Sequence, residues 1–133
     1  MKITLVTKDG VDMSVDRDVV EMSGMIKNLL EDVGDVESSI PLPEVSHATL
    51  KKVLAFCEHH KNEIVPTDRT KALTSYVLSE WDSEFFKVEK RMLFDIIIAS
   101  NYMDIKLLTL TTAKVIATKI AGMNVEEVKA YFD

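Results

Sequence analysis

Several residue types and patterns are scarce in this sequence, and each scarcity excludes a class of protein. The 133 residues include one cysteine, Cys57, so no internal disulfide can form, which is typical of a reducing compartment. No apolar run reaches the roughly 18 to 20 residues that span a bilayer, because Asp95, Asp104 and Lys106 interrupt the best candidate. The amino terminus shows no secretion signal. We therefore expect a cytoplasmic and nuclear protein that does not contact membranes.

Basic residues are too few for nucleic-acid binding. The chain has 16 Lys and Arg against 22 Asp and Glu, a formal charge of −6, and no basic cluster. Phosphate backbones are bound mainly by clustered Lys and Arg, so we expect no nucleic-acid partner. The hydrophobic fraction of 47% and the length indicate one globular unit.

Residues that could carry chemistry are also scarce. The nearest cluster is "CEHH", in which Cys57 and His59 would point about 200° apart on a helix and could not share a metal. The pattern favours a buried cysteine followed by a solvated helix end that carries His59 and His60. The four glycines form no phosphate-binding loop. We expect no metal, no cofactor and no enzymatic activity; the alternative is a Cys57 nucleophile with His47 or His59 as its base.

The first half of the chain predicts a small sheet with helices. Alternating apolar residues on either side of "KDG" predict a hairpin over residues 3–15, with Gly10 at positive φ. Helical spacing follows over residues 16–30, with Ser23 as an N-cap and Ile26, Leu29 and Leu30 on one face. The acidic stretch 31–39 is expected to be a solvated loop, and "SIPLPEV" an edge strand, because proline cannot donate to a ladder.

The second half predicts further helices. Ser46 can cap a helix whose buried face carries Leu50, Val53, Leu54 and Cys57. Residues 61–80 are expected to be a surface connection. Three helical segments follow: one from 83 that breaks near Val88, one over 105–122 that stops at Gly122, and a last one whose capping box is Asn124 with Glu127.

The stretch "MLFDIIIASNYMDIKLL", residues 92–108, is unusually apolar, at twelve of seventeen residues. On a helix it is apolar on nearly every side, either as a central core helix or as one with a second face for a partner. The helix after it is also strongly apolar, and the last helix offers Val125, Val128, Tyr131 and Phe132. We expect these last two helices to be insufficiently covered by the chain itself, which is typical of a protein interface.

Several motifs in order resemble the Skp adaptor family of SCF ubiquitin ligases. They are "DG" in the hairpin, "IKNLLED", "IPLPEV", "LKKVLAFCEHHK", "WDSEFFKV", "LFDIIIASNYMDIKLL" and "EEVKAYF". The resemblance implies an α+β BTB/POZ fold, a small three-stranded sheet surrounded by α-helices, with a C-terminal helical extension. It places the BTB/POZ unit at residues 1–104, with a variable surface segment at 61–80, and the extension at 105–133.

The resemblance also implies two partner surfaces in a non-catalytic adaptor. The cullin surface would include Asn101 and Tyr102 and, as weaker candidates, Pro41, Leu42 and Pro43. The F-box surface would comprise these residues: Leu107, Leu108, Val115, Ile116, Ile120, Val125, Val128 and Phe132. A weak homodimer is expected when the F-box protein is absent.

Some residues depart from the family pattern. The family commonly has glycine where this chain has Leu107, an acidic residue near Thr109, and proline where it has Val125. The family also continues beyond Asp133 with another helix that holds the F-box, so we expect weaker F-box binding without it. The alternative function is a BTB-type or kinetochore scaffold, or an elongin C-like adaptor, that acts without this cullin.

Overall fold

The computed structural model describes residues 2–33, 39–61 and 78–132, and its sheet has three strands. Strand β1 (Lys2–Val6) pairs antiparallel with β2 (Asp12–Asp16), and β3 (Ile40–Pro41) adds parallel to β1, giving the order β2-β1-β3. Gly10 has φ 81° in the connecting turn, a conformation that glycine adopts without steric cost. The predicted hairpin and the predicted edge strand with its proline are both confirmed.

Two helices occupy the stretch where the sequence predicts a single helical pattern. Helix α1 (Arg17–Val20) ends before Ser23, and α2 (Gly24–Val33) begins after it. The Ser23 hydroxyl accepts from the Ile26 amide at 3.2 Å, so the predicted N-cap is confirmed. Ile26, Leu29 and Leu30 lie on one face of α2 as predicted; Ile26 and Leu30 are buried, and Leu29 is 38% exposed.

The remaining described helices follow the predicted boundaries, except that the helix predicted to start at residue 83 starts at Glu80. They are α3 (His47–His60), α5 (Glu80–Phe85), α6 (Lys90–Met103), α7 (Lys106–Ile120) and α8 (Val125–Phe132). Ser46 caps α3 through the Thr49 amide, and α5 and α6 are separate on either side of Val88, as predicted. Asn124 and Glu127 form the predicted capping box at the start of α8. The predicted acidic loop at 31–39 is wrong at its start, because residues 31–33 belong to α2, and residues 34–38 lie outside the described residues. Most of the predicted connection at 61–80 also lies outside them.

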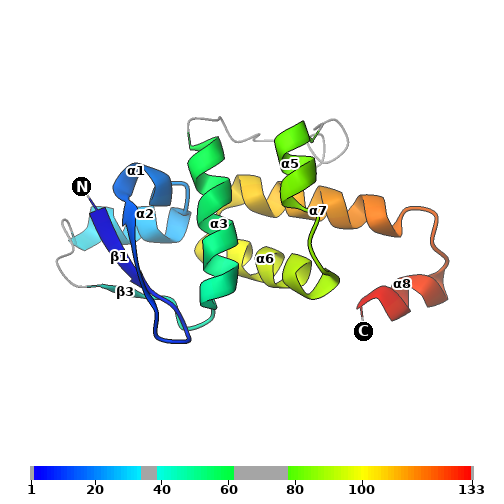
Figure 1. Ribbon diagram of the computed structural model, residues 1–133, viewed down its shortest axis with the longest axis horizontal. Coiled ribbons are helices and arrows are strands. Elements are labelled where there is room, and N and C mark those ends of the chain that lie inside the picture. The colour runs from blue at the N-terminus through cyan, green and yellow to red at the C-terminus, as the bar shows by residue number, and fades with distance from the viewer. Residues whose placement is uncertain (1, 34–38, 62–77, 133) are drawn as a thin grey trace.

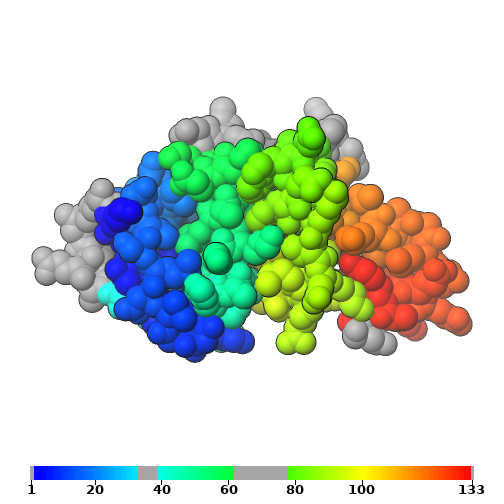
Figure 2. All heavy atoms as spheres, in the orientation of Figure 1, coloured from blue at the N-terminus to red at the C-terminus, as the bar shows by residue number. Residues whose placement is uncertain are grey.

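One hydrophobic core joins the sheet to the helices. It includes Leu5 of β1, Phe56 of α3, Ile96 of α6 and Leu108 of α7, all completely buried. Figure 1 shows the sheet with α1 and α2 at one end of an elongated molecule, α3 and α6 in the middle, and α8 at the opposite end. The space-filling view in Figure 2 shows the same succession along the molecule. The predicted α+β architecture, one small sheet with surrounding helices, is what the described residues form.

Two expectations about burial are wrong. His60 is 2% exposed, not solvated, because α5 covers the end of α3 and supplies a partner for the ring. The residues of α7 that were expected to lack cover are buried within the chain: Leu107 at 1% exposed, Leu108 at 0%, and Leu110, Val115 and Ile116 at 8% each. Helix α6 packs along α7, so this apolar surface belongs largely to the core.

Candidate functional site

The last turn of α6 presents the first candidate surface. Asn101 is exposed and Tyr102 is 36% exposed, although the neighbouring Ser100 and Met103 are completely or almost completely buried. Ile98 lies one turn before Tyr102 and is 59% exposed, which is unusual for a large aliphatic side chain. Residues three and four apart lie on the same side of a helix, so Ile98, Asn101 and Tyr102 form one face, which we call the α6 surface.

The α6 surface is held in place by the contact between the end of α6 and the start of α2. Asp104 ends α6 in the left-handed conformation, with φ 55° and ψ 54°. Its carbonyl accepts from the Gly24 amide at 2.8 Å, and the Ser23 hydroxyl donates to the Met103 carbonyl. A Cβ at Gly24 would collide with the Asp104 carboxylate. The residues that begin α2 therefore fix the position of the last turn of α6.

Ile98 is a candidate binding residue that the sequence did not single out. The pattern of residues 92–108 places apolar residues on nearly every side of the helix, so spacing alone could not say which one faces solvent. The exposed fraction distinguishes them: Leu93 and Ile96 are buried at 1% and 0%, whereas Ile98 is 59% exposed. An exposed aliphatic side chain beside an aromatic one is a common anchor of a protein interface.

The "PLP" segment contributes only its two prolines to the molecular surface. Pro41 and Pro43 are exposed, but Leu42 is 0% exposed and its amide donates to the Val6 carbonyl at 2.7 Å. Leu42 therefore packs in the core beside the sheet, and direct contact of its side chain with a partner, as predicted, is not compatible with this structure.

The second candidate surface lies on α8. Val125 is 71% exposed, Phe132 is 51% exposed and Val128 is half-buried, and their spacing places them on one side of the helix. We call these three residues the α8 face. Ile120, at the end of α7, is half-buried. Of the eight predicted F-box residues, these four keep accessible side chains, whereas Leu107, Leu108, Val115 and Ile116 can act only by supporting them or by lining a recess.

Aromatic contacts attach α8 to α6. The Phe94 ring stacks on Phe132 with centroids 5.6 Å apart and meets the edge of Tyr131 at the same distance. The Lys90 ammonium lies 5.4 Å from the Tyr131 ring centroid. Burial raises the pKa of the Tyr131 hydroxyl. Helix α6 thus carries one candidate surface near its end and supports the other near its start.

The "CEHH" residues do not form a reactive site. Cys57 is 1% exposed, and burial raises the pKa of its thiol to about 12, so the nucleophilic thiolate is strongly disfavoured. The His60 Nε2 lies 2.6 Å from the Asp82 Oδ1, and the His59 ring stacks on Trp81 at 3.9 Å. No cluster of three or more His, Cys, Asp or Glu suited to a metal occurs within residues 2–33, 39–61 and 78–132. Over those same ranges no helix is both long and apolar enough to cross a membrane.

Comparisons with known proteins identify the family. Residues 1–62 match the model of the Skp1 family, tetramerisation domain. Proteins described as E3 ubiquitin ligase complex SCF subunit sconC, from Neosartorya fischeri and Aspergillus fumigatus, are 45% identical over 133 residues, which cover 98% of this chain and 84% of each relative. The protein of the same description from Arthroderma otae is 43% identical over 137 residues, covering 99% of this chain and 82% of the relative. The chain therefore belongs to the Skp1 family.

Proposed function

We propose that this protein is an adaptor subunit of an SCF-type ubiquitin ligase, which bridges a cullin scaffold to F-box substrate receptors. The observation that carries the proposal is the identity of 45% with SCF subunits over nearly the whole chain. The buried, unreactive thiol of Cys57 supports a non-catalytic role, in which the protein works by contact and ubiquitin transfer takes place on other subunits.

The cullin binds the α6 surface in this proposal. Ile98 supplies exposed aliphatic area, Tyr102 a partly exposed ring, and Asn101 an amide that can both donate and accept hydrogen bonds. Burial of the apolar side chains would supply affinity, and hydrogen bonds of the Asn101 amide at their edge would fix the orientation of the cullin. Pro41 and Pro43 are secondary candidates for the same partner.

The F-box protein binds the α8 face together with Ile120. Val125 and Phe132 expose apolar area that a partner could remove from water. This assignment retains the predicted extension of residues 105–133 as the F-box-binding part and residues 1–104 as the BTB/POZ part. The hydrophobic core is continuous across that boundary, so the two parts would act as one rigid body.

Other partners follow from the same surfaces and from composition. With both surfaces free, a second copy of the chain could cover Val125 and Phe132, so a weak homodimer is expected in the absence of an F-box protein. The net charge of −6 gives no attraction for nucleic acid. We place the adaptor in the cytoplasm and nucleus, unattached to membranes.

The test is a pair of surface variants with opposite expected effects. Asn101→Lys with Tyr102→Lys should abolish cullin binding and leave F-box binding unchanged, because two charges replace the contact residues of the α6 surface. Val125→Asp with Val128→Asp should do the reverse: it changes the α8 face and keeps the Phe94–Phe132 contact that attaches α8 to α6. Binding of each partner is measured by calorimetry on variants whose circular dichroism matches the parent protein.

The matched control is Lys106→Gln, an exposed change at the start of α7 that touches neither surface. It should bind both partners as the parent protein does. Equal loss of both partners in either folded double variant would contradict the assignment of two separate surfaces.

A further inference from the structure

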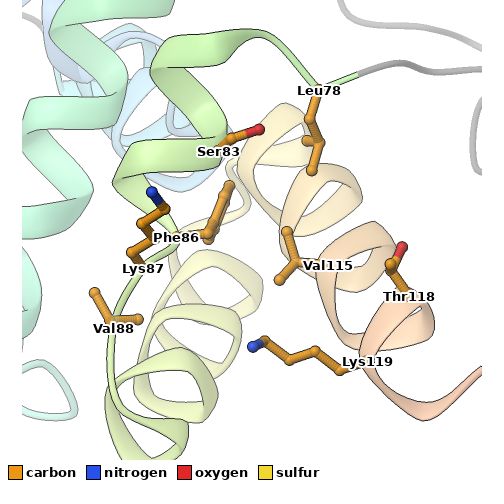
Figure 3. A pocket seen from close by; sticks show the side chains of 8 residues that line it. All are labelled: Leu78, Ser83, Phe86, Lys87, Val88, Val115, Thr118 and Lys119. Atoms are coloured by element: carbon orange, nitrogen blue, oxygen red, sulfur yellow. The ribbon is translucent and has the colours of Figure 1, made fainter.

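A pocket between α5 and α7 lies apart from both proposed partner surfaces. It has a volume of about 320 Å³ and is open to solvent on one side. Figure 3 shows one wall formed by residues of the 83–88 segment, the other wall formed by α7 residues, and Leu78 at one end of the pocket. Val115, Thr118 and Lys119 line it, and Ile120 points about 140° around the helix from Val115 and about 160° from Thr118. The pocket therefore faces a different side of α7.

The walls of the pocket are apolar. Phe86 and Val115 are 4% and 8% exposed and lie opposite each other, and Leu78 and Val88 are half-buried at its sides. A volume of 320 Å³ is at the lower end of the range for ligand sites, which is enough for one large aliphatic side chain with its adjoining backbone. The lining therefore suits an apolar group of that size.

The charged residues at the pocket are both cations. Lys87 and Lys119 line it, and no Asp or Glu is among the described lining residues, although the chain as a whole has a charge of −6. Lys87 donates to Glu84 at 2.7 Å, and Figure 3 shows its ammonium on the α5 side, away from Val115. Lys119 extends from α7 toward the segment that carries Val88, and the ion pairs among the described residues do not include it. An anionic group at the opening would find a partner in Lys119.

Two hydroxyl groups complete the rim. Ser83 and Thr118 are exposed and line the pocket from α5 and α7. The Thr118 hydroxyl donates to the Lys114 carbonyl at 2.9 Å and keeps its lone pairs available as acceptors. Hydroxyls on both sides of an apolar recess can bond the amide groups of a peptide that crosses it. This arrangement favours a peptide over a compact small molecule.

We propose that this pocket binds a peptide segment of a partner protein in which a large aliphatic residue stands beside an acidic one. The aliphatic side chain enters between Phe86 and Val115, and the carboxylate pairs with Lys119. The α6 surface and the α8 face take no part, so this binding can succeed or fail independently of the cullin and F-box assignments.

The test is an amide chemical-shift titration of the full chain with the capped peptide Gly-Glu-Leu-Glu-Gly. One aliphatic group and one exposed ion pair predict a Kd of about 1 mM, with shifts centred on Val88, Thr118 and Lys119. The peptide Gly-Glu-Ala-Glu-Gly should bind about tenfold more weakly, because it leaves the apolar recess unfilled. Thr118→Phe, which places a ring over the opening from an exposed position, should abolish binding.

The charge interaction is isolated by a double-mutant cycle with the peptide Gly-Gln-Leu-Gln-Gly. Lys119→Gln should weaken binding of the acidic peptide about three- to fivefold and leave binding of the glutamine peptide unchanged. Lys106→Gln, the matched control on the same helix, should change neither. The proposal is overturned by equal losses for both peptides, by shifts centred elsewhere, by no saturation at about 10 mM peptide, or by equally tight binding of 4-methylpentanoate alone.

Discussion

Asp82 is completely buried, and its partner His60 is 2% exposed. The 2.6 Å contact between the Asp82 Oδ1 and the His60 Nε2 joins the end of α3 to α5 inside an aromatic cluster that includes Phe56 and Trp81. In such a site a polar group that loses its partner cannot form a hydrogen bond with water instead. This pair therefore contributes more to the free energy of unfolding than an exposed pair would. It also positions the 83–88 segment that forms one wall of the pocket.

We expect Asp82→Ala to lower the free energy of unfolding by about 3 kcal/mol or more, because it removes the carboxylate that contacts the buried His60 ring at 2.6 Å. Asp82→Asn, which keeps one hydrogen bond, should cost about 1 to 3 kcal/mol. Urea denaturation measures both. The control is Asp95→Asn, since the Arg91–Asp95 pair spans 3.8 Å on the surface and should contribute less than about 0.5 kcal/mol. Equal effects at Asp82 and Asp95 would contradict this role.

Cys57 gives a second prediction at this scale. Because burial raises the pKa of its thiol to about 12, the thiol stays protonated and shielded across the physiological range. In the folded protein we expect no measurable reaction with a disulfide reagent between pH 7 and pH 9, and full reaction once guanidinium unfolds the chain. Rapid labelling of the folded protein would instead favour the enzyme alternative built on Cys57.

At the scale of elements, α2 and α6 approach each other closely at Gly24. Gly24→Ala should lower the free energy of unfolding by about 1 kcal/mol or less, because the new methyl group meets the exposed Asp104 carboxylate, which must change its rotamer to make room. Asp104→Gly in the same background should restore stability, since it removes the carboxylate and suits the positive φ at that position. Thermal unfolding checks both, and a second change that fails to restore stability would contradict the proposed contact.

Spacing and caps predict most of the elements, because both are local properties. Ser46, Gly10 and the Asn124–Glu127 box each act within four residues of their own position, and each is found where the sequence indicates. The break between α1 and α2 is harder to predict, because Ser23 also donates to the distant Met103 carbonyl. A contact between residues 80 positions apart cannot be predicted from the spacing of apolar residues around Ser23.

At the scale of the whole molecule, burial decides which predicted site residues can touch a partner. Asn101 and Tyr102 are accessible, whereas Leu42 and Leu107 are covered by the sheet and by neighbouring helices. The sequence could rank these residues by hydrophobicity only. Exposure depends on how α6 lies against α3 and α7, and that packing distinguishes Ile98 from the equally apolar Ile96.

The two proposed surfaces share α6 as their common support. Phe94, which holds α8, lies two turns before Tyr102, about 12 Å along the helix axis. Such a separation along one rigid helix would let two proteins bind side by side without competing for the same residues. Simultaneous binding is therefore the central requirement of the bridging function.

The mass of the assembly in solution tests this requirement most directly. The chain is mixed with a cullin amino-terminal domain and an F-box protein, and light scattering after size exclusion gives the molar mass. We predict one complex that contains one copy of each protein. With the Asn101→Lys, Tyr102→Lys variant, the complex should contain the chain and the F-box protein and lack the cullin. Two separate binary complexes, with the cullin and the F-box protein excluding each other, would contradict the bridging function.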